Sequence, residues 1–157
     1  MPFFILYWKY FPATAQTEDP YMSIDRQLET ALRIATLKHE GQFDKQGVPY
    51  IEHPTRVAES LHDPGLKIVA LLHDTIEDTD CTRDELLKSG IDAAFVDMVC
   101  ALTHNKNEPY LDYIRRLKKT NPEVIPVKLA DIHDNLRPGC PAILRKRYLE
   151  ALQVLEG

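Results

Sequence analysis

The sequence has few of the features that mark disulfide-stabilised or nucleic-acid-binding proteins. Its three cysteines, Cys81, Cys100 and Cys140, are widely spaced and form no Cys-x-x-Cys pair. This pattern argues against a disulfide framework or a thiolate metal site and predicts a reducing, cytoplasmic compartment. Lysine and arginine number 19 against 24 aspartates and glutamates, a net charge of −5. Nucleic-acid-binding domains usually carry a basic face, so we expect no nucleic-acid partner.

The sequence also lacks an apolar run of the roughly 20 residues that a membrane helix needs, so we expect no membrane partner. Residues 2–11 (PFFILYWKYF) are strongly apolar, but they lack the basic start and the cleavage site of a signal peptide. We predict that residues 1–21 are an N-terminal extension and that the domain covers residues 22–157. The alternative is a short strand or arm that packs on a partner subunit.

Helical periodicity dominates the rest of the chain, and strand signals are sparse. Ser23 is placed to cap a first helix, and Thr82–Glu85 is a capping-box pattern that begins another. Prolines begin the helices expected over residues 109–119, 122–136 and 141–155. A chain of 157 residues can bury a core without disulfides. The sequence therefore predicts a single all-α domain, a bundle of roughly seven helices.

The most informative segment is residues 66–76, an apolar run whose helix would be buried on all sides. It contains His73 and Asp74. Glu77 and Asp78 follow them at i+4 spacing, so the four side chains can face one site. Burying such groups without partners is costly, and a divalent cation is the simplest partner for carboxylates and neutral imidazoles together. The alternative is a helix that emerges into solvent here and leaves the carboxylates hydrated.

Two further segments add ligands of the same kind. Val127–Asp131 is a second apolar helix that delivers a carboxylate, and Asn135 shares the face of Asp131. His53 stands at the start of another helix, directly before Pro54. Two imidazoles and two carboxylates make a mixed nitrogen and oxygen site that suits manganese, iron or zinc, whereas a closed structural zinc site would more often use cysteine.

Four segments, taken in order, resemble the HD superfamily of metal-dependent phosphohydrolases. In particular they resemble the hydrolase domain of the RelA/SpoT alarmone enzymes and their small stand-alone relatives, including the metazoan SpoT homologue. A lone His-Asp pair is a weak signal, but the ordered set is specific. The segments are Lys38–Phe43 (KHEGQF), Gly47–Pro54 (GVPYIEHP), Ala70–Thr79 (ALLHDTIEDT) and Val127–Asp131 (VKLAD).

The resemblance implies an HD phosphohydrolase domain that binds one divalent metal ion. The ion is manganese in the alarmone hydrolases, and iron, zinc, cobalt and nickel are alternatives. Such an ion lowers the pKa of bound water and polarises a phosphoryl oxygen. The ligands that the resemblance implies are His53, His73, Asp74 and Asp131.

The resemblance also implies roles for other residues. Glu77 and Asp78 would position and deprotonate the attacking water. Lys45 and Asn135 would contact the nucleotide. The reaction of the family removes pyrophosphate from the 3′ position of guanosine 3′,5′-bis(diphosphate) and leaves GDP.

Positive charge suggests further residues that could contact the substrate. Lys128 and Arg137 are candidate cations for the phosphoryl oxygens, although Lys128 could equally be a surface charge. The basic residues 115–119 and 145–147 are expected on solvated helix faces.

The stretch around Glu108 resembles a branch of small bacterial HD phosphohydrolases in which Glu108, Tyr110 and Tyr113 line the pocket. The alternative is that both tyrosines are core residues. His39, near the end of the first helix, is another candidate for substrate contact, and His104 is a weaker one.

One departure from the family bears on the substrate. The family usually has a basic pair, including an arginine that can stack on the base, where this chain has Asp44 and Lys45. Losing the arginine weakens the prediction of guanine recognition. The runner-up is therefore a phosphatase or phosphodiesterase that acts on another nucleotide, and a third possibility is a nucleotide sensor without turnover. The intact ligand set argues against the sensor. We expect a hydrolase without a synthetase half, with a small-molecule nucleotide as substrate, that acts as a monomer or homodimer.

Overall fold

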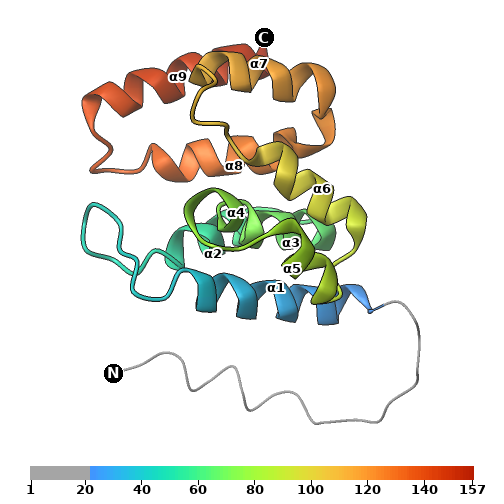
Figure 1. Cartoon of the computed structure of the whole chain (residues 1–157). Helices are drawn as coiled ribbons and strands as arrows, with labels where there is room; N and C mark the ends of the chain where they lie inside the picture. Colours follow the sequence, from blue (N-terminus) through green and yellow to red (C-terminus); the bar gives the residue numbers. More distant parts are fainter. Residues whose placement is uncertain (1–21) are drawn as a thin grey trace.

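Figure 1 shows the protein in a computed structural model that describes residues 22–157. The predicted extension, residues 1–21, lies outside the described residues. The described part contains nine α-helices, one 3-10 helix and no strand beyond an isolated bridge between Phe43 and Pro49, which confirms the predicted all-α fold. The elements are α1 (Ile24–Lys38), α2 (Glu52–Glu59), α3 (Pro64–Leu72), α4 (Thr75–Asp78), α5 (Arg83–Lys88), α6 (Ala93–Leu102), α7 (Tyr110–Thr120), η3 (Pro122–Val124), α8 (Ile125–Asn135) and α9 (Ala142–Glu156).

Side-chain caps begin several of these helices. The side chains of Ser23 and Thr82 accept hydrogen bonds from backbone amides in the first turns of α1 and α5, as the sequence predicted. Asp63 caps α3 in the same way. Each cap satisfies an amide that has no partner within its helix. The caps therefore fix where the chain passes from loop to helix.

The structure corrects the prediction of one continuous helix over residues 66–76. α3 ends at Leu72, and α4 begins at Thr75. His73 Nδ1 lies 2.6 Å from the carbonyl oxygen of Ala70, and the Thr75 hydroxyl donates to the carbonyl oxygen of Leu72 at 2.8 Å. Such side-chain bonds compete with the N–H groups of a continuing helix. His73 therefore lies at a junction between two helices, and this interruption contributes to a helix number above the seven expected.

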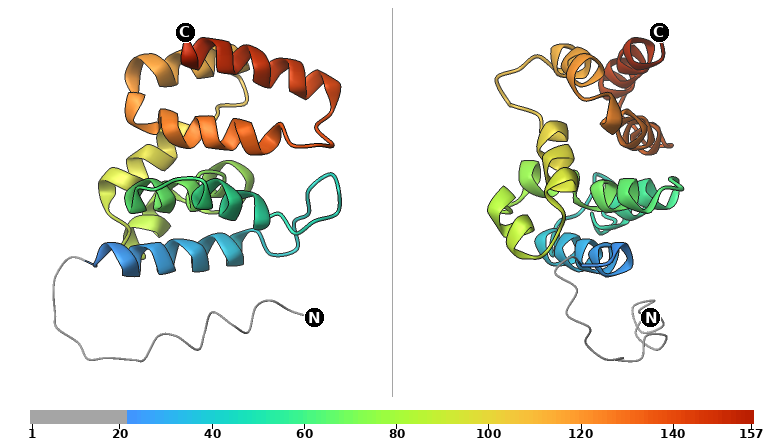
Figure 2. Two further views of the ribbon diagram at one scale, coloured as in Figure 1. Left: turned by 180° about the vertical axis from the view of Figure 1, so that it is seen from behind. Right: turned by 90° about the vertical axis from the view of Figure 1, so that its right-hand side faces the viewer.

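The helices are stacked in layers, with α1 on one side, α2 to α4 in the middle, and α7 and α9 beyond α8 (Figure 1 and Figure 2). α3 is the central element, because it packs against α1, α2, α6 and α8. α2 also packs against α8. These contacts bring α2, the α3–α4 junction and α8 together in the middle of the molecule.

The core is built around α3. Ile68, Val69 and Leu72 of this helix are completely buried, as its apolar run predicted. Although α3 is strongly apolar, it has only nine residues, and no helix within residues 22–157 is long and apolar enough to cross a membrane. Fully buried side chains from the surrounding helices close the core, and they include Ala31, Val57, Leu86, Val96, Leu117 and Ile132.

Truncating the central helix should destabilise the fold. We expect Ile68→Ala to lower the free energy of unfolding by about 2–5 kcal/mol, because it leaves a cavity among well-packed neighbours. Leu37→Ala removes a side chain that is 59% exposed and should change it by less than about 0.5 kcal/mol. Urea denaturation measures both values. Equal effects of the two substitutions would contradict the central position of α3.

Candidate active site

Three of the predicted metal ligands converge from separate helices. His53 lies in the first turn of α2, His73 follows α3, and Asp131 lies in α8. One ligand atom from each residue lies within 4.8 Å of the others, and all three side chains are buried. Asp131 Oδ1 is 3.1 Å from His53 Nε2 and 3.5 Å from His73 Nε2. A single ion between them could therefore contact all three.

The fourth predicted ligand, Asp74, borders the same cluster. Its Oδ2 atom lies 3.1 Å from His73 Nε2 and 3.6 Å from His53 Nε2. The hydroxyl of Tyr50 donates a hydrogen bond to this oxygen at 2.5 Å, which holds the carboxylate in place. The structure thus brings together all four residues that the sequence predicted as ligands.

The imidazoles are arranged as metal ligands usually are. His73 Nδ1 faces the carbonyl oxygen of Ala70, which can only accept, so Nδ1 carries a proton, and in the neutral imidazole Nε2 has the free lone pair. His73 Nε2 is buried and has no hydrogen-bond partner within the described part of the chain. An unpaired buried nitrogen is costly. A cation bonded to Nε2 would remove this cost, so the donor set fits a divalent metal.

Asp134 orients the other imidazole. Its Oδ2 atom lies 2.7 Å from His53 Nδ1, and Arg56 donates two hydrogen bonds to the same carboxylate at 2.8 and 3.0 Å. Burial raises the pKa of Asp134, but His53 and Arg56 lower it by more, so that it stays well below its usual range. A carboxylate behind a ligating histidine is the common outer arrangement of metal sites. This role of Asp134 was not predicted from the sequence.

The charges in the cluster favour a bound cation. Burial lowers the pKa of His73, but the carboxylates of Asp74 and Asp131 raise it by more. Burial also opposes ionisation of Asp74, yet His73 and the neighbouring His53 hold its pKa at about 2. The cluster therefore attracts positive charge. A divalent ion would supply that charge and leave both imidazoles neutral.

Glu77 and Asp78, the predicted catalytic carboxylates, lie beside the ligands. Glu77 Oε2 accepts a hydrogen bond from the His104 amide at 2.9 Å. Burial and the neighbouring Asp74 raise the pKa values of both Glu77 and Asp78. A carboxylate with a raised pKa is a stronger proton acceptor, so either residue is suited to take a proton from water.

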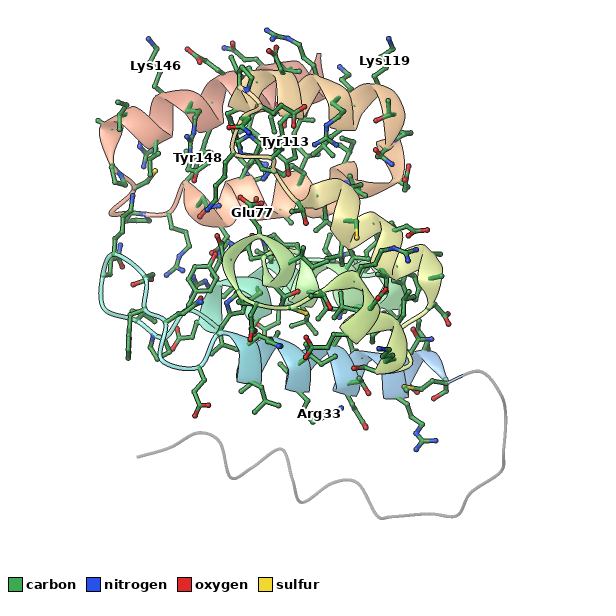
Figure 3. All side chains as sticks on the ribbon, viewed as in Figure 1. Arg33, Glu77, Tyr113, Lys119, Lys146 and Tyr148 are labelled. Carbon is green, nitrogen blue, oxygen red and sulfur yellow. The ribbon has the colours of Figure 1, made fainter. Side chains whose placement is uncertain are left out.

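Two adjoining cavities open around this cluster. The first has a volume of about 190 Å³ and is lined by the four candidate ligands together with Glu77 and Asp78. Figure 3 shows Tyr148 and Tyr113 on the inner side of α9 and α7, above Glu77. The second cavity, of about 330 Å³, lies toward the loop of residues 43–50. The two cavities share part of their lining, namely Tyr50, His53, Asn135 and Tyr148.

Four residues predicted to contact substrate line the first cavity. Lys128 is buried and donates to Asp131 at 2.7 Å, so the alternative of a surface charge is wrong. Asn135 also donates to Asp131 at 2.7 Å. Tyr110 is half-buried, and Tyr113 is a core residue whose hydroxyl donates to a backbone carbonyl. The two interpretations of Tyr113, pocket and core, therefore both hold.

Other predicted contacts lie elsewhere. Lys45 and Arg137 line the second cavity. His39 lines neither cavity and packs against the ring of Tyr50, with 4.8 Å between the ring centroids. Glu108, expected in the pocket, pairs with Arg116 at 3.0 Å instead. This ion pair also corrects the assignment of Arg116 to a purely solvated face.

Arg147 and Tyr148 are the main cavity residues that sequence reasoning did not identify. Arg147 is exposed, as the predicted solvated face requires, but it also lines the first cavity, where its guanidinium lies 4.5 Å from the ring centroid of Tyr110. Nothing in the local sequence distinguishes Arg147 from Arg145 or Lys146. The packing of α9 against α7 and α8 decides which of the three borders the cavity.

Comparison with known proteins finds relatives named as pyrophosphohydrolases and as pyrophosphokinases. The proteins named guanosine-3′,5′-bis(diphosphate) 3′-pyrophosphohydrolase MESH1 from Homo sapiens and Mus musculus are 40% identical over 123 residues, 71% of this chain and 68% of theirs. The Danio rerio protein of that name is 38% identical over 150 residues, 83% and 82% of the two chains. A GTP pyrophosphokinase of Streptomyces coelicolor is 36% identical over 142 residues, and the chain spans only 17% of its length.

A solved structure is similar throughout the fold. It is described as a metazoan ortholog of SpoT that hydrolyzes ppGpp. It matches with a TM-score of 0.68 and 26% identity over 91% of this chain and 86% of its own. No protein-family model matches the sequence.

Removing the carboxylate behind His53 should weaken metal binding. We expect Asp134→Asn to reduce the affinity for Mn²⁺ by about 10- to 100-fold, because the imidazole loses its orientation and part of its basicity. Titration calorimetry with Mn²⁺ measures the change. Asp112→Asn alters an exposed ion pair with Arg115 and should leave the affinity unchanged. Wild-type affinity in Asp134→Asn would show that Asp134 does not support a metal ligand.

Proposed function

The chain belongs to the family of HD-type hydrolases that includes MESH1 and the RelA/SpoT proteins, and on that premise we propose that it hydrolyses guanosine 3′,5′-bis(diphosphate) at the 3′ position. The observation that carries the proposal is the meeting of two imidazoles and two carboxylates around the unpaired Nε2 of His73, beside a cavity. The products are GDP and pyrophosphate.

In the proposed reaction His53, His73, Asp74 and Asp131 hold one divalent ion. When bound, the ion supplies positive charge that polarises a phosphoryl oxygen and acidifies neighbouring water. Manganese is the proposed ion, and iron, zinc, cobalt and nickel suit the same donor set.

Glu77 is the proposed proton acceptor, and the amide of His104 fixes its orientation at 2.9 Å. As the proton passes to Glu77, the water oxygen bonds to the phosphorus that carries the 3′ oxygen. The bond between that phosphorus and the ribose oxygen breaks, and the ribose oxygen takes up a proton. Asp78, which lines the same cavity, helps to position the water. One water and one guanosine 3′,5′-bis(diphosphate) thus give one GDP and one pyrophosphate.

The second cavity is the proposed place of the nucleoside. It adjoins the cluster through Tyr50, His53 and Asn135, and Lys45 also lines it. The first cavity holds about 190 Å³, below the roughly 300–1,000 Å³ of typical small-molecule sites. A whole nucleotide therefore needs both cavities.

A second candidate function rests on Asp44. Its carboxylate accepts hydrogen bonds from the amides of Gln46 and Val48 at 2.8 and 2.9 Å, so it shapes the loop. The stacking arginine that the resemblance places here is missing. A phosphohydrolase that acts on a nucleotide with another base is therefore the runner-up.

The three cysteines are free thiols, which supports the proposed cytoplasmic location. A monomer or a homodimer that binds no nucleic acid is the proposed working form.

A screen with Mn²⁺ tests the proposed function. Guanosine 3′,5′-bis(diphosphate), NADPH and simple nucleoside mono- and diphosphates are the substrates, and Asp74→Ala is the inactive control. We expect the bis(diphosphate) to yield GDP and pyrophosphate. Turnover of other nucleotides alone would favour the runner-up, and binding without turnover would contradict an enzyme.

Replacing the proposed proton acceptor should separate catalysis from metal binding. We expect Glu77→Gln to lower kcat by about 10²- to 10⁴-fold, because the amide cannot accept the proton. Mn²⁺ affinity should stay within about twofold, since Glu77 is not a proposed ligand. Glu29→Gln, on the exposed face of α1, should match the wild type. Full activity of Glu77→Gln would rule out this role.

A further inference from the structure

The first cavity contains two cationic side chains that differ in their partners. Lys128 is paired with Asp131 at 2.7 Å. Arg147 makes no ion pair with any carboxylate of residues 22–157. Its guanidinium instead lies against aromatic rings, 4.5 Å from the centroid of Tyr110 and 5.6 Å from that of Tyr148. The charge of Arg147 is therefore available to an anion.

The charge balance of the cavity calls for such a cation. Four carboxylates line it, those of Asp74, Glu77, Asp78 and Asp131, against the two cations Lys128 and Arg147. With neutral imidazoles, two negative charges remain, and one divalent ion only cancels them. A diphosphate brings several more negative charges. A second site of positive charge is needed to hold the phosphate that lies farther from the metal ligands.

The size of the cavity and an unpaired hydroxyl point the same way. About 190 Å³ leaves room for the phosphate end of a nucleotide beside the ligands but not for its base. The hydroxyl oxygen of Tyr110 is buried and has no hydrogen-bond partner within the described residues. Tyr110 and Arg147 thus offer a hydrogen-bond donor and a guanidinium fork on one wall of the cavity.

We propose that Arg147, supported by the ring and hydroxyl of Tyr110, binds the terminal phosphate of the 3′-diphosphate and selects diphosphate over monophosphate substrates. The inference rests on the proposed function and adds the residue that determines specificity at the same site. A planar guanidinium can donate two parallel hydrogen bonds to one phosphate, which an ammonium group cannot match. The aromatic face of Tyr110 keeps that fork in place.

The test compares two substrates with the full chain loaded with Mn²⁺. Values of kcat/KM are measured for guanosine 3′,5′-bis(diphosphate) and for guanosine 5′-diphosphate 3′-monophosphate. We expect Arg147→Gln to lower kcat/KM by about 10- to 100-fold on the former and by less than about threefold on the latter. Arg147→Lys should fall between the wild type and Arg147→Gln. Equal losses on both substrates, or no loss, would overturn the inference.

Lys146→Gln is the matched control, because this neighbouring cation does not line the cavity and points away from it on the outer side of α9 (Figure 3). It should leave both substrates unaffected. A wild type without turnover on either substrate defeats the proposed function, and the Arg147 inference is then decided by binding of methylenediphosphonate to the Mn²⁺-loaded chain. Binding at least about 10-fold weaker in Arg147→Gln supports the inference, and equal binding overturns it.

Discussion

The structure depends on keeping a cluster of ionisable groups in a water-poor interior. Asp74, Asp131, His53 and His73 meet where three helical segments come together, and their charges are compensated only in part by Lys128. Burial opposes every one of these charges, while the groups themselves stabilise one another. A divalent ion resolves this conflict, because it satisfies the carboxylates and the free imidazole nitrogens together. The residues that would hold the ion are thus also buried residues of the centre of the fold.

The rest of the fold supplies fixed positions for this centre. The break between α3 and α4 turns His73 and Asp74 toward α8, and the hydrogen bonds that make the break also set the tautomer of His73. Tyr50 and Asp134 hold ligands from outside the cluster. Beyond it, α7 and α9 add aromatic rings and a guanidinium to the wall of the cavity. The residues around the cluster thus orient the candidate ligands or line the cavity, and the cluster itself holds the groups that could bind a metal ion.

How far the sequence predicts this site depends on how local each signal is. His73 and Asp131 are conspicuous in the sequence because each is an ionisable residue within an apolar run. Ser23 and Thr82 indicate where helices begin, because their side chains can cap a first turn. The break after Leu72 was not predicted, because the side-chain bonds that cause it leave no trace in periodicity. Arg147 was missed for another reason: its place beside Tyr110 depends on how α9 packs against α7. Long-range packing, rather than composition, decides which of several similar cations enters a site.

One divalent ion is proposed to lie between His53, His73, Asp74 and Asp131. Anomalous diffraction from crystals grown with saturating Mn²⁺ would locate it. We expect a single strong peak at bonding distance from Nε2 of both histidines and from an oxygen of each aspartate. A peak at another group of side chains, or none at this one, would contradict it.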